Sequence, residues 1–233
     1  MESSKTKKLV IVAMMAALAY IVMILIKIPM LVDYLKYDPK DVIIAVTGFL
    51  FGPLEALVTA LVVCVIEAFT VGTTGWIGAV MNFLASCSFA VVASLVYRRK
   101  RTLPGAVAGL VCGVVCLTVM MLLWNYFLTP VYTGMPRETV AAMLPTVFLP
   151  FNLIKGGINA ALTLLIYKPV VITLRRTGLV PAGRSLSSGQ DDARPASSGA
   201  GSRSSDRISP LVMIAAAVVL AICIALAVIL TKA

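Results

Sequence analysis

Residues 42–70 read VIIAVTGFLFGPLEALVTALVVCVIEAFT, a long apolar run in which Glu55 and Glu67 are the charged positions. As one α-helix the run would be about 43 Å long at 1.5 Å per residue, which exceeds the ~30 Å hydrocarbon core of a bilayer. Gly52 and Pro53 interrupt it, because proline disrupts an intrahelical hydrogen bond and glycine turns freely. The stretch is therefore either one long kinked crossing or two shorter ones.

The composition of the whole chain is that of an integral membrane protein. Of its 233 residues 60% are hydrophobic and 13% are charged, and the mean hydropathy is +1.00; soluble domains carry about 25% charged residues. These values exclude an ordinary soluble globule and a disordered chain. Further runs are long enough to span a bilayer: Leu9–Met30, Trp76–Val96, Gly105–Leu128, Val147–Tyr167 and Leu211–Leu230.

The distribution of basic residues decides between one and two crossings in residues 42–70. The chain has a net charge of +10, and Lys and Arg collect on cytoplasmic loops. With a cytoplasmic N-terminus, two crossings place the basic run 98–101 and most later basic residues inside, whereas one crossing places that run outside. Two crossings are therefore favoured. The first of them, Val42–Phe51, is short and must be tilted or shielded by neighbouring helices.

The predicted fold is an all-α integral membrane bundle of six transmembrane helices with an additional C-terminal transmembrane helix. Residues 1–8 form a cytoplasmic N-terminus and residues 9–175 form the six-helix domain. Residues 176–210 are rich in Ser, Gly and Pro, which is typical of a flexible linker. Residues 211–230 form the additional helix. The expected location is the plasma membrane, as a multi-pass protein.

Polar side chains inside a membrane are costly and often functional. Asn152, Lys155 and Asn159 share one face of the sixth predicted helix, because they stand three and four residues apart. By the predicted topology, Asn82, Asn125, Asn152 and Lys155 lie in the outer half of the bundle. They could grip a planar polar ligand, or they could bond neighbouring helices while Lys155 extends to the surface.

Two outer loops add candidate ligand contacts. Leu35–Asp41 reads LKYDPKD, in which Tyr37 offers a ring for stacking and Asp38 a hydrogen-bond acceptor; a plain turn leading into a helix fits the same residues. Trp76 stands at the edge of a short loop and offers a second aromatic surface. Glu55 and Glu67 are candidates for a proton relay, although neither has an evident partner in the sequence.

Several chemistries are excluded or disfavoured. The chain has no histidine, so a histidine-ligated metal site and a Ser/His/Asp triad are impossible. It has no G-x-x-x-x-G-K-[ST] loop, no H-E-x-x-H and no G-x-S-x-G. We therefore expect neither enzyme activity nor catalytic residues, no metal and no cofactor. Ala13-x-x-x-Ala17 on the first helix would let another helix approach closely.

Together these motifs resemble the riboflavin-specific substrate-binding subunit, or S component, of energy-coupling factor (ECF) vitamin transporters, over about residues 9–175. The resemblance rests on the order and spacing of LKYDP (35–39), GFLFGP (48–53), GWIG (75–78), MNF (81–83), Asn125-Tyr126 and LPFNLIKG (149–156).

The resemblance implies a six-helix fold with an outward-facing pocket for riboflavin as the transported substrate. It implies that Asn125, Asn152 and Lys155 hydrogen-bond the flavin, with Asn82 as a further contact, and that Tyr37 and Asp38 close over it. It also implies that Ala13 and Ala17 pack against a transmembrane coupling subunit, and that two separate ATPase subunits supply energy. The linker and the seventh helix are additions to the family pattern.

Three rival functions remain open from the sequence. The same fold could take another vitamin, such as thiamine or a pyridoxine. The chain could be a stand-alone secondary transporter, for which Glu55 and Glu67 are the candidate coupling sites. It could also be a flavin-handling electron-transfer or enzyme subunit, although no motif for the partner chemistry is present.

Overall fold

The computed structural model describes residues 2–176, apart from 31 and 72–74, together with residues 221 and 225. The predicted linker, apart from its first residue, and the predicted seventh helix, apart from residues 221 and 225, lie outside the described residues.

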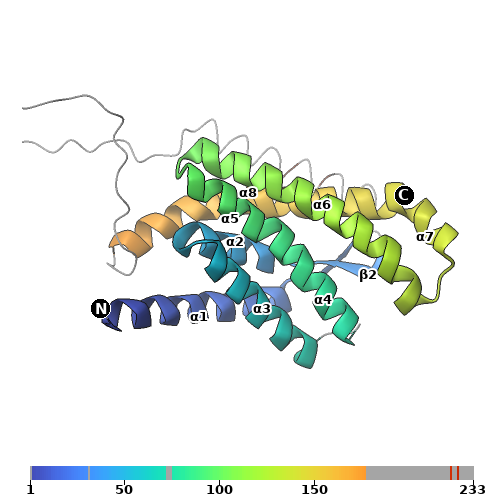
Figure 1. Cartoon of the computed structure of the whole chain (residues 1–233), viewed down its shortest axis with the longest axis horizontal. Helices are drawn as coiled ribbons and strands as arrows, with labels where there is room; N and C mark the ends of the chain where they lie inside the picture. Colours follow the sequence, from blue (N-terminus) through green and yellow to red (C-terminus); the bar gives the residue numbers. More distant parts are fainter. Residues whose placement is uncertain (1, 31, 72–74, 177–220, 222–224, 226–233) are drawn as a thin grey trace, which may run out of the picture.

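The described chain is a bundle of helices with one small hairpin (Figure 1). Two long helices, α4–η1–α5 and α7–η2–α8, each contain a short π-helical segment. The elements are α1 (Glu2–Leu25), β1 (Ile28–Met30), β2 (Val32–Tyr37), α2 (Lys40–Phe51), α3 (Pro53–Thr70), α4 (Gly75–Ser86), η1 (Cys87–Val91), α5 (Val92–Arg99), α6 (Leu103–Thr133), α7 (Arg137–Met143), η2 (Leu144–Phe148) and α8 (Leu149–Arg176).

The break in residues 42–70 falls where the sequence predicts it. α2 ends at Phe51, and α3 begins at Pro53. Gly52 between them has a φ of 122°, a conformation that residues with a Cβ rarely adopt. Proline is well tolerated at the first position of α3, because the first amides of a helix have no intrahelical acceptor.

The short helix α2 is shielded by its neighbours, as expected for a crossing of this length. It packs against α1, α3 and α8, and its residues from Lys40 to Phe49 are all buried. Among the described residues, five helices are long and apolar enough to span a bilayer: Lys5–Leu25, Pro53–Thr70, Gly75–Arg99, Leu103–Val131 and Arg137–Tyr167. With 12 residues, α2 is shorter than these, so a sixth crossing stays a prediction.

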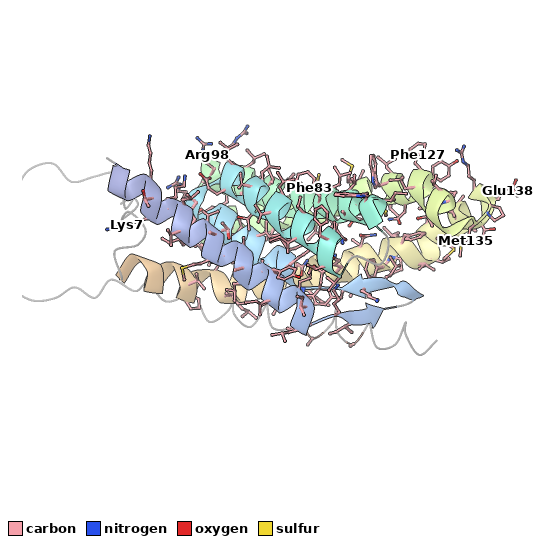
Figure 2. All side chains as sticks on the ribbon, turned by 90° about the horizontal axis from the view of Figure 1, so that it is seen from below. Lys7, Phe83, Arg98, Phe127, Met135 and Glu138 are labelled. Carbon is pink, nitrogen blue, oxygen red and sulfur yellow. The ribbon has the colours of Figure 1, made fainter. Side chains whose placement is uncertain are left out.

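The basic segments of the first and fourth predicted crossings lie at the same end of the bundle. Figure 2 shows Lys7 and Arg98 toward one end, and Met135 and Glu138 at the other. Lys8 on α1 also forms an ion pair with Glu55 at the start of α3. This common end is the arrangement that the positive-inside rule requires of two crossings in residues 42–70.

The β-hairpin corrects the all-α prediction. The first predicted span extended to Met30, but α1 ends at Leu25, and the chain then turns back on itself. Ile28 pairs with Tyr37 and Pro29 with Lys36, with an irregularity between Pro29 and Met30. Pro29 provides the physical reason, because its ring cannot continue a helix and disfavours helical conformation in the residue before it.

Glycines bring α6 into backbone contact with the preceding helix. A Cβ on Gly109 would lie 2.6 Å from the carbonyl oxygen of Ala93, and one on Gly113 would lie 2.6 Å from that of Phe89. Small residues at such a crossing allow the close packing that replaces the hydrophobic driving force inside a membrane. This close packing fixes the position of α6, the helix that carries Asn125, relative to the preceding helix.

We expect Gly109→Val to lower the melting temperature of the detergent-purified protein, because the new side chain would collide with the Ala93 carbonyl. Overpacking of this kind typically costs about 1–3 kcal/mol. Val111→Leu is the matched control, since Val111 is on the same helix and is 58% exposed. An unchanged melting temperature for Gly109→Val would contradict the close contact.

Candidate functional site

Five charged side chains are buried together where the hairpin, α2, α3 and α8 meet. Lys40 and Asp41 have exposed fractions of 1% and 0%, and Asp38, Glu67 and Lys155 are also buried. Buried charges are expensive and need partners. The grouping of three carboxylates with two ammonium groups supplies those partners.

Two lysines connect the carboxylates. Lys40 Nζ lies 2.5 Å from Glu67 Oε2 and 3.8 Å from Asp38 Oδ1. Lys155 Nζ lies 3.7 Å from Asp38 Oδ2 and 3.8 Å from Asp41 Oδ2. The ammonium group of Lys155 is therefore held inside the bundle and does not extend to the surface, which answers the alternative that the sequence left open.

Asp41 is held by two further donors. The hydroxyl of Ser86 donates to Asp41 Oδ1 at 2.5 Å, and Asn159 Nδ2 donates to Asp41 Oδ2 at 3.3 Å. Asn159 also accepts a hydrogen bond from the Tyr37 hydroxyl at 3.0 Å. Asn159 therefore links α8 to the hairpin through Tyr37 and to α2 through Asp41.

Tyr37 and Asp38 lie outside the helices, and their surroundings determine whether each side chain donates or accepts hydrogen bonds. Burial raises the pKa of the Tyr37 phenol, and the nearby Asp41 and Asp38 carboxylates raise it further. The phenol therefore stays protonated and donates to Asn159. Burial also favours a higher pKa for Asp38, but Lys155 and Lys40 outweigh it and hold that pKa below its usual value. Asp38 is therefore a charged acceptor.

A cavity opens above this cluster. Its empty volume, counting the part open to solvent, is about 1080 Å³. Its polar lining comes from the hairpin region, α3, α4, α6 and α8: Lys27, Lys36, Asp38, Glu67, Asn82, Asn125, Asn152 and Lys155. Its apolar lining is Leu35, Ala68, Gly78, Ala79, Met81, Ala85, Met121 and Phe151.

The carboxamides in the cavity are oriented by specific contacts. Asn125 Nδ2 donates to the Met121 carbonyl at 2.7 Å, and Asn152 Nδ2 donates to the Phe148 carbonyl at 2.8 Å. Asn82 Nδ2 instead donates to Glu67 Oε1 on α3 at 3.0 Å. Asn82 and Asn152 are thus anchored through their nitrogens, and Asn125 is held at both ends, because its Oδ1 atom also accepts from the Thr129 hydroxyl at 3.0 Å.

Five of the seven predicted ligand-contact residues line this one cavity, namely Asp38, Asn82, Asn125, Asn152 and Lys155. Tyr37 lies beside it, buried against Phe151, Ile154 and Ile158. Trp76 is 64% exposed, and its ring packs edge-on against Phe69 with centroids 5.1 Å apart. Neither aromatic residue is part of the cavity lining, so a ligand contact for them stays a prediction.

The sequence reasoning missed several residues of the site. It left Glu67 without a partner, but the structure pairs it with Lys40. It gave no role to Lys40 or Asp41 beyond a turn, although both flank Pro39 in the LKYDPKD motif. The sequence did carry a signal for this cluster. Two lysines and three acidic residues fall within or beside apolar segments, where charges are expected to pair with one another. Among the described residues, no group of three or more His, Cys, Asp and Glu could hold a metal ion.

Comparisons with known proteins relate the chain to transport proteins. Residues 7–167 match the family described as "ECF transporter, substrate-specific component". The chain is 30% identical over 181 residues to the riboflavin transporter RibU of Staphylococcus aureus (strain TCH60), covering 74% of this chain and 94% of that protein. It is 31% identical over 173 residues to the riboflavin transporter FmnP of Bacillus subtilis (strain 168), covering 70% and 91%.

The fold is similar to one already solved. A structure described as "Structure and mechanism of the S component of a bacterial ECF transporter" superposes with a TM-score of 0.64 at 29% sequence identity. The match covers 74% of this chain and 99% of the other.

Proposed function

The chain belongs to the substrate-specific components of ECF transporters, and from that premise we propose that its cavity captures riboflavin on the outer side of the membrane. The protein is a multi-pass membrane protein and a riboflavin transporter subunit of this family. It binds the vitamin as a substrate and leaves it chemically unchanged.

The observation that carries the proposal is the convergence of polar groups from four helices on one cavity. Asn125 and Asn152 have exposed fractions of 2% each, and Lys155 approaches from the same face of α8 as Asn152. The isoalloxazine ring presents carbonyl oxygens, ring nitrogens and an imide N–H, which carboxamides and an ammonium group can bond. Because riboflavin is uncharged, Lys155 acts as a hydrogen-bond donor and keeps Asp38 and Asp41 as its counter-ions.

The hairpin region adds contacts from the other side. The Asp38 Oδ1 atom is buried and accepts no hydrogen bond within the described residues, so it is available to a hydroxyl or imide donor of the ligand. Tyr37 and Trp76 are proposed to supply stacking area when the vitamin is bound. Phe151 and Met121, which line the cavity, provide apolar wall.

The first helix is proposed as the docking face for a transmembrane coupling subunit, with two ATPase subunits supplying energy. Ala13 and Ala17 are exposed on α1, whereas Ala16 and Ala19 on the same helix are buried in the core. The small-xxx-small face therefore points away from the bundle and leaves room for a partner helix. The N-terminus is proposed to be cytoplasmic.

The secondary-transporter alternative finds less support. Each of its two candidate coupling carboxylates has a lysine partner, with Glu55 paired to Lys8 and Glu67 to Lys40. Uptake by this chain alone, without ATPase subunits, would favour the alternative.

The proposed substrate is tested by purifying the protein from cells grown with riboflavin and recording its visible absorption. We expect co-purified flavin, with one flavin released per chain on denaturation. A protein that is free of flavin, but is saturated by added thiamine or pyridoxine, would assign the same fold to another vitamin. A bound flavin that turns over with a reductant would favour the electron-transfer alternative.

Lys155→Ala and Asn152→Ala are each expected to weaken riboflavin binding by more than about 1 kcal/mol, or about fivefold in Kd, the scale of a hydrogen bond to a buried or charged group. Flavin fluorescence quenching measures the affinity. Thr163→Ala is the control, because Thr163 is buried on α8 and donates to the Asn159 carbonyl of its own helix. Wild-type Kd values for folded Lys155 and Asn152 variants would refute the assignment.

Ala13→Leu/Ala17→Leu is expected to abolish riboflavin uptake in cells that hold the coupling and ATPase subunits, because larger side chains prevent close helix approach. The Kd of the purified variant should stay at the wild-type value, since the cavity is unchanged. Val10→Leu, on the exposed side of the same helix, is the control. Normal uptake by the double variant would contradict docking through this face.

A further inference from the structure

We propose that Lys40 and Glu67 are positioning residues that orient the Asn82 carboxamide, so that its carbonyl oxygen selects a ligand with a hydrogen-bond donor at that place. The inference rests on the proposed riboflavin site and adds a specificity device to it.

The carboxylate of Glu67 is divided between two partners. Its Oε2 atom lies 2.5 Å from Lys40 Nζ on α2, and its Oε1 atom accepts from Asn82 Nδ2 on α4 at 3.0 Å. Three helices therefore meet at one side chain. Both ends of the ion pair are buried, with 1% and 7% of the side chains exposed.

The chemistry of a carboxylate fixes which way the Asn82 amide faces. An ionised carboxylate only accepts hydrogen bonds, so the Asn82 group that meets it must be the NH₂ group. Within the described residues, Asn82 Oδ1 accepts no protein hydrogen bond. The carbonyl oxygen is consequently the part of this cavity-lining amide that is available to a ligand.

Lys40 holds the Glu67 carboxylate in place through the ion pair. The lysine begins α2 and has almost no exposed surface, with Met23 Sδ 3.7 Å from its Nζ atom. A buried lysine at this position would be unstable without a carboxylate partner, because an unpaired buried charge is strongly destabilising. The pair thus maintains the acceptor that orients Asn82.

Asn82 differs in this respect from the other two cavity asparagines. Asn125 and Asn152 donate to carbonyls four residues earlier in their own helices, so α6 and α8 orient them by themselves. The orientation of Asn82 depends on a side chain from another helix. A change at Glu67 should therefore alter the recognition of one ligand group and leave the remaining contacts in place.

The ligand group that fits the Asn82 carbonyl oxygen is a hydrogen-bond donor. Riboflavin offers two kinds, the imide N–H of the isoalloxazine and the hydroxyls of the ribityl chain. A site built to bond a substrate N–H or O–H discriminates strongly against analogues that lack it, because its own polar atom is then left unpaired. N3-methylriboflavin lacks the imide donor, and lumiflavin lacks the ribityl hydroxyls, so the two analogues separate the two sources.

The test measures Kd for riboflavin and both analogues with Glu67→Gln. A glutamine can turn its NH₂ group toward Asn82 and reverse the Asn82 amide. We expect riboflavin affinity to fall about tenfold, the scale of one buried hydrogen bond. The preference for riboflavin over one of the two analogues should shrink by a similar factor, which loss of folding alone would not produce.

Three further variants make the test selective. Lys40→Met/Glu67→Gln leaves no unpaired lysine, so it should repeat the loss of discrimination even if Glu67→Gln alone is unstable. In a protein that already carries Asn82→Ala, Glu67→Gln should have no further effect on the preference for riboflavin over the analogue. Glu55→Gln is the matched control, because Glu55 lies on the same helix and pairs with Lys8; it should leave all three Kd values unchanged.

Two results would overturn the inference alone: an equal loss of affinity for riboflavin and both analogues, or additive effects of Glu67→Gln and Asn82→Ala on the preference. A folded wild-type protein that binds no riboflavin would overturn the proposed function and this inference with it.

Discussion

The cost of burying a charge is the constraint on which the site depends. A buried ammonium or carboxylate group must find its counter-charge within the protein. In this chain five such groups lie together, and Lys40 and Lys155 each contact two carboxylates. The lysines therefore hold the hairpin, α2, α3 and α8 in one arrangement, because separating any of these elements would leave a buried charge unpaired.

The short helix α2 follows from the same constraint. It begins at Lys40 and Asp41, whose side chains have almost no exposed surface, and it ends at the Gly52–Pro53 break. A helix of 12 residues surrounded by α1, α3 and α8 carries charge at its first turn without meeting lipid. The long helices around it provide the apolar exterior, and α2 provides Lys40 and Asp41, which pair with the cavity-lining Glu67 and Lys155.

Much of this arrangement could be predicted from the sequence. The break at Gly52–Pro53 and the common end of Lys8 and the basic run 98–101 follow from helix length and charge. The shared face of Asn152 and Lys155 follows from helical spacing, and the predicted topology places Asn125 in the same half of the bundle. The hairpin could not be predicted, since Ile28–Met30 is too short for a strand pattern. The pairing of Lys40 with Glu67 joins positions 27 residues apart, and such a contact depends on packing that no local period encodes.

The buried cluster also bears on energetics across the membrane. Three carboxylates against two ammonium groups leave at most one net charge, and riboflavin adds none. A membrane potential does about 2.3 kcal/mol of work per elementary charge for each 100 mV, so moving these five groups together across the bilayer would involve at most about that much electrical work. Without the two lysines, the three carboxylates would carry about three times that electrical work, so the ion pairs limit how strongly a membrane potential can act on the site.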